Sequence, residues 1–116
     1  MTEEEIRNSL LRDLIALNID VKGFELVLRP YSKSYYGRYM PKYKRVIVYL
    51  YEDIELQKQY SYEEIFSTVL HEVVHHIQWS KPDFERVKGV MHNADFYNIY
   101  NGLMRRHKIY KSVNRR

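Results

Sequence analysis

The sequence predicts an α+β fold in which an N-terminal helix is followed by a small β-sheet or hairpin, a central helix and a C-terminal helix. Three observations predict it. The 116 residues are the size of one domain. Apolar residues recur at helical spacing near both ends and in the middle, and short β-branched and aromatic segments lie between them. We therefore treat residues 1–116 as a single domain, with 110–116 as a basic, frayed tail.

Two capping boxes mark helix starts. In Thr2-x-x-Glu5 and Ser61-x-x-Glu64, a hydroxyl residue precedes a glutamate, and the two side chains can satisfy the free amides of a first helical turn. The apolar stripe after the first box predicts a helix over about 3–18, and the second box predicts a helix that begins directly after it. This second helix is apolar around much of its circumference, which predicts a buried, central position.

The remaining elements lie between and after these helices. Two segments rich in β-branched and aromatic side chains predict strands, FELVLRP (24–30) and RVIVYLY (45–51). Pro82 and Gly89 predict a connection with about one helical turn between them. Asn93 is the expected cap of a last helix, whose apolar residues share one face.

The composition excludes several classes of site. The chain has no cysteine, which excludes disulfides, thiolate metal ligands and a cysteine nucleophile, and this fits a reducing compartment. The opening residues, MTEEEIRNSL, are acidic, unlike a secretory signal, and no apolar run approaches the roughly 18 residues of a membrane span. We therefore expect a soluble, cytoplasmic domain with no membrane partner.

The central helix contains the most specific motif of the chain, H-E-x-x-H, formed by His71, Glu72 and His75. Residues four apart lie on one helix face, so the two histidines can reach a single metal ion. Such an ion lowers the pKa of a bound water, and Glu72 can accept the water's proton. Burying these groups without strong partners is costly, so the pattern indicates a metal site rather than a polar core. We expect one Zn²⁺ per chain.

A catalytic zinc ion usually has three protein ligands. We predict His92, which lies 17 positions after the last histidine of the motif, as the third ligand, with Asp95 and Glu85 as alternatives. His76 is rotated by about 100° from its neighbour in the motif, so we expect it to support the site or to pack rather than to bind the metal. We interpret His107, which lies among basic residues, as part of a solvated face.

From this motif to the last helix, the chain resembles the SprT-like zinc metalloproteases, which include the Spartan-type DNA–protein crosslink proteases. The resemblance rests on SYEEIFSTVLHEVVHHIQW, a short connection and HNADFY, in which Phe96 follows His92. It is strong over about 61–100 and weaker back to about 24, where GRYMPKYKRVIVYL is similar to the family's strand region. The family often has glycine where this chain has Asn93, and many members have a C-terminal cysteine zinc ribbon, which this cysteine-free chain lacks.

The resemblance implies a zincin-like minimal metalloprotease fold with a defined set of zinc ligands and a general base: His71, His75 and His92 with Glu72. It also implies that the strand around Val46–Tyr51 forms the sheet edge beside the cleft, where an extended peptide pairs. An oxyanion stabiliser is expected as well, and the spacing leaves Tyr97 and Tyr100 as alternatives.

The segment 29–45 combines six basic residues and five tyrosines with no acidic residue. Cations can hold phosphates and aromatic rings can stack on unpaired bases, so this segment is a candidate contact for DNA or for substrate. The alternative is a polar hairpin whose tyrosine rings cover the small sheet. The candidate contact residues are Arg29, Lys33, Tyr35, Tyr36, Arg38, Tyr39, Lys42 and Lys44.

These observations predict a zinc-dependent metallopeptidase that hydrolyses peptide bonds with a zinc-activated water and Glu72 as general base, with DNA-associated proteins as one class of substrate. One alternative is a zinc hydrolase of a phosphoester or nucleotide, because the motif specifies the metal and the water but not the bond. The other is a nucleic-acid-binding or regulatory module with a non-catalytic zinc site. The presence of Glu72 argues against this last alternative.

Overall fold

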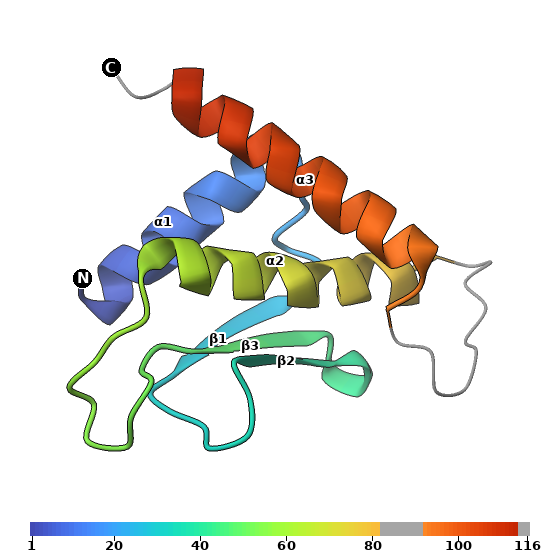
Figure 1. Ribbon diagram of the computed structural model, residues 1–116. Helices are drawn as coiled ribbons and strands as arrows, with labels where there is room; N and C mark the ends of the chain where they lie inside the picture. The colour runs from blue at the N-terminus through green and yellow to red at the C-terminus, as the bar shows by residue number, and fades with distance from the viewer. Residues whose placement is uncertain (82–91, 114–116) are drawn as a thin grey trace.

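The computed structural model describes residues 1–81 and 92–113, which form an α+β fold, as the sequence predicts (Figure 1). These residues contain three α-helices and one three-stranded sheet. In chain order the elements are α1 (Glu3–Ala16), β1 (Glu25–Arg29), β2 (Gly37–Met40), the short 3-10 helix η1 (Pro41–Tyr43), β3 (Arg45–Tyr49), α2 (Tyr62–Trp79) and α3 (Ala94–Val113).

The sheet has the strand order β1-β3-β2, so β3 is its central strand. β1 runs parallel to β3, whereas β2 runs antiparallel to it, with Gly37 opposite Val48. The expectation that the strand around Val46–Tyr51 forms the edge beside the cleft is therefore wrong, because β2 pairs with that side of β3 and is itself the edge strand. The tyrosine-rich segment 29–45 does not form a hairpin by itself: it contributes β2 and η1, and β2 pairs with β3, most of which lies beyond the segment.

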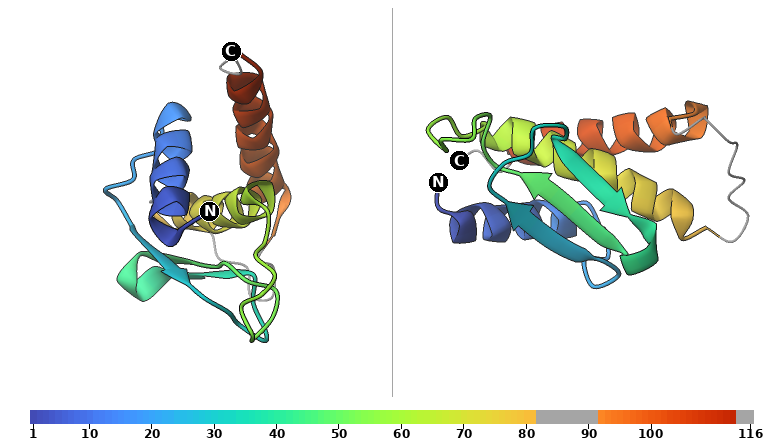
Figure 2. Two further views of the ribbon diagram at one scale, coloured as in Figure 1. Left: turned by 90° about the vertical axis from the view of Figure 1, so that its left-hand side faces the viewer. Right: turned by 90° about the horizontal axis from the view of Figure 1, so that it is seen from below.

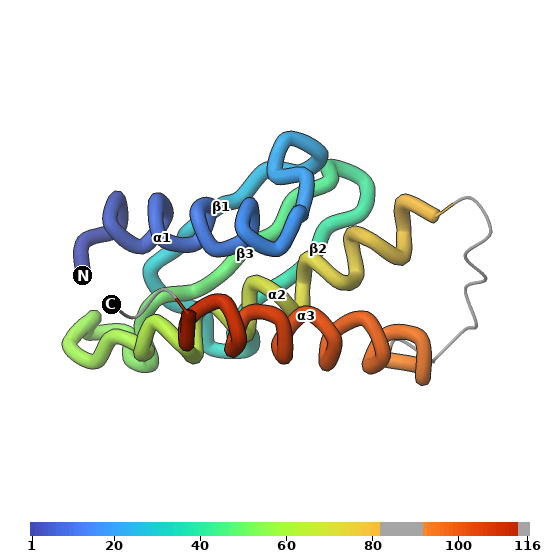
Figure 3. Tube along the Cα trace, turned by 90° about the horizontal axis from the view of Figure 1, so that it is seen from above, coloured from blue at the N-terminus to red at the C-terminus, as the bar shows by residue number. Residues whose placement is uncertain are grey.

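All three helices lie on the same face of the sheet (Figures 1 and 2). α2 lies closest to the strands, and α1 and α3 flank it when the molecule is seen from above (Figure 3). The core between these layers contains apolar side chains from every helix and from β1 and β3. Its α2 members extend from Ile65 to Val74, which confirms the central, buried position predicted for this helix.

Each helix begins directly after the residue that the sequence predicts as its cap. Thr2, Ser61 and Asn93 accept hydrogen bonds from amides in the first turns of α1, α2 and α3. α1 ends at Ala16, slightly before the predicted end, because Asn18 adopts a left-handed conformation with a φ of 61°. Local capping chemistry therefore determines where these helices start.

The C-terminal helix is longer than the sequence predicts. α3 extends to Val113, so residues 110–113 are helical and do not belong to a frayed tail. The predicted connection between Pro82 and Gly89, like residues 114–116, lies outside the described part of the chain. Within the described ranges, none of the helices combines the length and the hydropathy that crossing a membrane requires.

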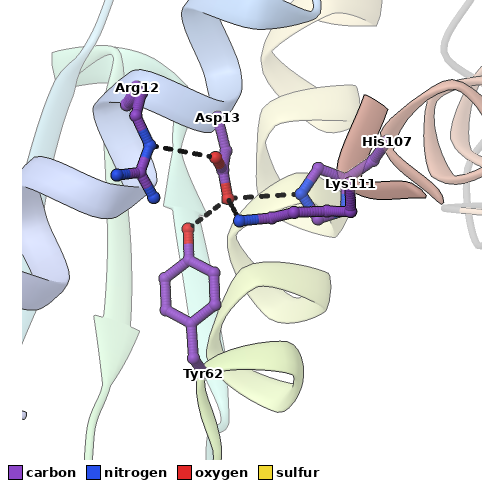
Figure 4. Close-up of polar contacts among 5 residues, drawn as sticks. All are labelled: Arg12, Asp13, Tyr62, His107 and Lys111. Atoms are coloured by element: carbon purple, nitrogen blue, oxygen red, sulfur yellow. Dashed lines mark hydrogen bonds and ion pairs between the residues drawn. The ribbon is translucent and has the colours of Figure 1, made fainter. Parts of the chain in front are cut away.

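A buried carboxylate joins the three helices (Figure 4). Asp13 of α1 is fully buried, and it accepts hydrogen bonds from the Tyr62 hydroxyl at 2.6 Å and from His107 Nε2 at 3.2 Å. Lys111 Nζ lies 3.2 Å from the same carboxylate. His107 also stacks on Phe66, with ring centroids 3.9 Å apart. The interpretation of His107 as part of a solvated face is therefore wrong, because its ring packs between two helices.

Candidate metal centre

Two of the three candidate ligands come from adjacent turns of α2. The rings of His71 and His75 are four residues apart and lie edge to face, with centroids 5.2 Å apart. The neighbouring Val73 and Val74 are fully buried in the core and fix the rotation of the helix. With these valines in the core, both imidazoles are directed towards Phe96 of α3, whose ring centroid lies 4.8 and 4.7 Å from theirs.

His92, two residues before α3, completes a cluster of three imidazoles. Its Nε2 atom lies 2.9 Å from Nε2 of His71 and 3.2 Å from Nε2 of His75. One nitrogen from each of the three rings lies within 4.8 Å of the other two. The structure thus brings together the three histidines that the sequence predicts as ligands, although they lie up to 21 positions apart in the chain.

The alternative ligand Asp95 is held away from this cluster. Gln78 Nε2 donates a hydrogen bond to Asp95 at 2.9 Å and lies 3.3 Å from the Asn93 amide oxygen, and the Gln78 side chain is only 1% exposed. Because Asn93 caps α3, these contacts fix the start of that helix and, with it, the position of His92. The other alternative, Glu85, lies outside the described residues.

The environment of the cluster favours neutral imidazoles, the form that binds metal. Burial, followed by the neighbouring His71 and His92, lowers the pKa of His75 to about 4. Burial and the neighbouring His92 also lower the pKa of His71. At neutral pH, both histidines of α2 therefore keep a lone pair available for coordination.

The three ring nitrogens cannot all be satisfied by one another. Neutral imidazole has a single N–H, so His92 Nε2 can share a proton with only one of its two neighbours at a time. A metal ion between the rings could accept the lone pairs of all three. Two of the nitrogen separations are 2.9 and 3.2 Å, and all three nitrogens lie within 4.8 Å of one another. The described residues thus form a possible metal site of three nitrogen donors.

Glu72 lies beside this cluster at an open cleft of about 360 Å³. The cleft is lined by Thr68, His71 and Glu72 of α2, by residues 34–37 and by Tyr100 of α3. The Glu72 side chain is 8% exposed, and burial raises its pKa to about 7. A carboxyl group with this pKa is poised to exchange a proton near neutral pH.

Gly37 allows the edge strand to approach this part of α2 closely. A Cβ atom at this position would lie 2.6 Å from Cγ2 of Thr68 and 2.9 Å from the carbonyl oxygen of Ile47. It would also lie 3.4 Å from Cγ of Glu72. Any larger residue would push β2 and α2 apart, so Gly37 sets the distance between the edge strand and Glu72.

Only one of the two candidate oxyanion stabilisers lines the cleft. Tyr100 is half-buried there, with its ring centroid 6.0 Å from that of His71, and burial raises the pKa of its phenol. Tyr97 is 48% exposed and lies beside His92 instead, with ring centroids 6.2 Å apart. Tyr100 therefore has the better position to donate a hydrogen bond within the cleft.

His76 faces away from the cluster, as expected from its rotation around α2. Its Nδ1 atom lies 2.8 Å from the Tyr39 hydroxyl, and its ring packs edge to face on Phe24, with centroids 5.2 Å apart. Burial, followed by the nearby Lys44, lowers the pKa of His76. This histidine therefore packs α2 against β2 and the start of β1.

The structure divides the basic, tyrosine-rich segment between several surfaces. Tyr35 and Tyr36 line the cleft beside Glu72, and the Arg38 guanidinium lies over the Tyr35 ring, 4.7 Å from its centroid. A separate hollow beside Trp79 is lined by Tyr39, Lys42 and Lys44. The remaining two candidates, Arg29 and Lys33, are exposed and line neither the cleft nor the hollow beside Trp79. DNA contact through this segment stays a prediction.

Sequence reasoning missed two residues that shape the site, Gln78 and Gly37. Gln78 lies three positions after His75, so it shares a helix face with the motif, and a glutamine on a buried face needs a polar partner. That signal could have identified it as a contact of the following helix. Gly37 offers no comparable signal, because its role depends on how closely β2 passes Thr68.

Fold and site together define an α+β protein with a cluster of three histidines that could bind a metal ion. No protein-family model, curated protein or solved structure matches the chain. The inference of function therefore rests on the chemistry and geometry of the site.

Proposed function

We propose that this protein is a zinc-dependent metallopeptidase with a zincin-like, SprT-like catalytic core. The observation that supports the proposal is the convergence of His71, His75 and His92 beside Glu72, a buried carboxylate at an open cleft. A purely structural zinc site is normally closed by four protein ligands. Three nitrogen donors next to a base and a cleft are instead typical of a hydrolytic site.

His71, His75 and His92 would hold the zinc ion. When bound, zinc supplies a Lewis acid that favours loss of a proton from water and polarises a carbonyl group. The base is the residue next to the first ligand, Glu72, whose pKa of about 7 suits proton transfer near neutral pH. Glu72 accepts a proton from the attacking water and passes it to the amine that leaves when the peptide bond breaks.

The edge strand β2 offers a place for an extended peptide. Within the described residues, no strand pairs with its outer edge, and its first residue, Gly37, lines the cleft. A peptide that adds to this edge is held by backbone hydrogen bonds, which are independent of its sequence. Tyr100, on the opposite side of the cleft, would donate a hydrogen bond to the oxyanion that develops during the reaction.

The proposal can be tested with protein purified without chelator or affinity-metal resin. We expect about one zinc ion per chain by elemental analysis and metal-dependent cleavage of an unfolded protein. The Glu72→Gln variant should retain zinc but cleave at least about 100-fold more slowly, because general bases contribute roughly 10²–10⁴-fold. Glu63→Gln is the matched control, since Glu63 is exposed on the first turn of α2 and lines none of the described spaces.

Two outcomes would overturn the proposal. Absence of zinc, with none taken up on addition, would identify the cluster as a polar core. Zinc-dependent cleavage of single-stranded DNA or nucleotides, without cleavage of protein, would instead favour a hydrolase of phosphoesters. A panel that contains all three substrates therefore separates the alternatives in one experiment.

A further inference from the structure

A second hollow, of about 270 Å³, adjoins the cleft beside Glu72. The two spaces share Tyr36, Ser67 and Thr68 in their walls. The second hollow is bounded further by Tyr49, Tyr60, Glu64 and Ile65. It therefore lies towards the N-terminus of α2, on the side away from His75.

Aromatic rings dominate this hollow. The rings of Tyr36 and Tyr60 are tilted towards each other, with centroids 5.6 Å apart, and Tyr49 contributes a third ring from β3. The faces of aromatic rings carry a partial negative charge and attract cations within about 6 Å. Three tyrosines around one small space form a wall that suits a cationic group.

The charges around the hollow are negative. Burial raises the pKa of Tyr60, and the neighbouring Tyr36, Glu52 and Glu64 raise it further. Glu52 pairs with Lys58 at 3.2 Å, whereas no ion pair within the described ranges involves Glu64. Glu64 thus contributes an uncompensated negative charge to a wall that is otherwise made of neutral side chains.

We propose that this hollow is a substrate subsite that binds a lysine or arginine side chain. The inference rests on the proposed peptidase function, because the subsite adjoins the cleft at which the peptide would be cut. The aliphatic stem of such a side chain can lie against the tyrosine rings while its charged end reaches Glu64. Acidic and short polar side chains lack both interactions, so the hollow selects for basic residues.

The geometry also sets the position of the basic residue along the substrate. Glu64 and Glu72 are eight positions apart on α2, which corresponds to about 12 Å along the helix axis. An extended peptide rises about 3.3 Å per residue. The basic residue therefore lies about two to four residues from the bond that is cut, always on the same side of it.

The test uses fluorescent, unstructured peptides in a serine–alanine background, with one variable position occupied by lysine, norleucine or glutamate. Binding to zinc-reconstituted Glu72→Gln protein is measured by fluorescence anisotropy, so no hydrolysis is required. We expect lysine to bind roughly tenfold more tightly than norleucine, and glutamate to bind most weakly. Adding Glu64→Gln should remove most of the advantage of lysine, because glutamine keeps an oxygen acceptor for the Ser61 hydroxyl but not the charge.

Glu63→Gln is again the matched control, because it removes the same charge one residue away, outside the hollow. Equal affinity for lysine and norleucine, or equal losses in Glu63→Gln and Glu64→Gln, would overturn the subsite. Cleavage of peptides without a basic preference would leave the peptidase proposal intact while removing this inference. Selective binding of lysine peptides through Glu64, with no cleavage by the wild-type protein, would support the subsite and contradict the peptidase.

Discussion

Two clusters of polar side chains connect α2 to α3, and they differ in how their hydrogen-bonding groups are matched. Near the start of α2, the Asp13 carboxylate receives donors from Tyr62, His107 and Lys111. In the second half of α2, three imidazoles point their nitrogens at one another, with His92 Nε2 in contact with two others. The carboxylate of the first cluster is supplied with donors, whereas in the second cluster His92 Nε2 cannot form hydrogen bonds with both neighbouring nitrogens at once.

This difference separates a structural cluster from a candidate functional one. Each cluster contains a buried side chain, Asp13 in one and His75 in the other, and both contain histidine, so burial and residue type alone do not distinguish them. The Asp13 cluster is satisfied without any further atom, and Asp13 lines none of the described spaces. A cation could satisfy the histidine cluster, and His71, its first histidine, lines a cleft.

The largest expected effect concerns the metal. His92→Ala should weaken zinc binding by about 1,000-fold, because it removes one of three protein ligands, whereas Asp95→Ala should change affinity little. Competition with a chromophoric chelator measures both constants. An affinity of Asp95→Ala as low as that of His92→Ala would mean that the carboxylate joins the site, and the contrast between the two clusters would then fail.

The next effect concerns stability without metal. Asp13→Ala should lower the free energy of unfolding by about 2–3 kcal/mol, because hydrogen bonds to charged groups contribute roughly 1.5–3 kcal/mol and the lost partners include a buried tyrosine hydroxyl. Zinc affinity should stay nearly unchanged. Urea denaturation of the metal-free proteins gives the first quantity, and the chelator competition gives the second.

The Asp13 carboxylate should also make the stability of the protein depend on pH. Burial raises the pKa of Asp13, but hydrogen bonds from Tyr62, His107 and Lys111 outweigh burial, so the pKa in the folded protein is lowered. Its contribution to stability is therefore complete above the unfolded pKa of about 3.9 and is lost as the pH falls through the lower folded value. The difference in stability between wild type and Asp13→Ala should shrink below about pH 4. A difference that stayed constant to low pH would show that the ionised carboxylate contributes nothing.

A substitution of Gln78 tests whether its hydrogen bonds fix the start of α3, beside His92. Gln78→Leu keeps the side-chain volume but removes the hydrogen bonds to Asn93 and Asp95. Residues that form a hydrogen bond directly with a metal ligand contribute roughly 10–100-fold to metal affinity. Gln78 contacts only the residues beside His92, so we expect zinc affinity to fall by about tenfold, the lower end of this range. The absorption spectrum of the cobalt-substituted protein should broaden if His92 loses its fixed position. An unchanged spectrum and affinity would assign Gln78 to packing alone.

The sequence predicts the three helices, two of the three described strands and the histidine cluster, because these depend on local patterns. Capping residues and helical periodicity locate α1, α2 and the start of α3, and the spacing of His71 and His75 puts both on one face of α2. The prediction for His92 succeeds in placing it beside them because few residues separate it from the helix it must fold back onto.

Contacts between segments that are distant in the chain could not be predicted from the sequence. The edge position of β2 depends on pairing between strands, and its four residues lack the β-branched pattern that marked β3. His107 sits among basic residues in the chain, yet the helical twist turns its ring towards Phe66 and Asp13. The basic neighbours of His107 in the sequence therefore led to a wrong prediction, because successive side chains of a helix point in different directions.

The smallest effect concerns His76, the histidine that belongs to neither cluster. His76 is adjacent to a candidate ligand, but its Nδ1 atom lies 2.8 Å from the Tyr39 hydroxyl, its hydrogen-bond partner among the described residues. Tyr39→Phe should lower the free energy of unfolding by about 1 kcal/mol, the net value of one hydrogen bond, and leave zinc affinity unchanged. Thermal unfolding with and without zinc measures both. If zinc affinity fell together with stability, His76 would act on the metal through α2, and pairing with a donor would no longer distinguish a structural histidine from a ligand.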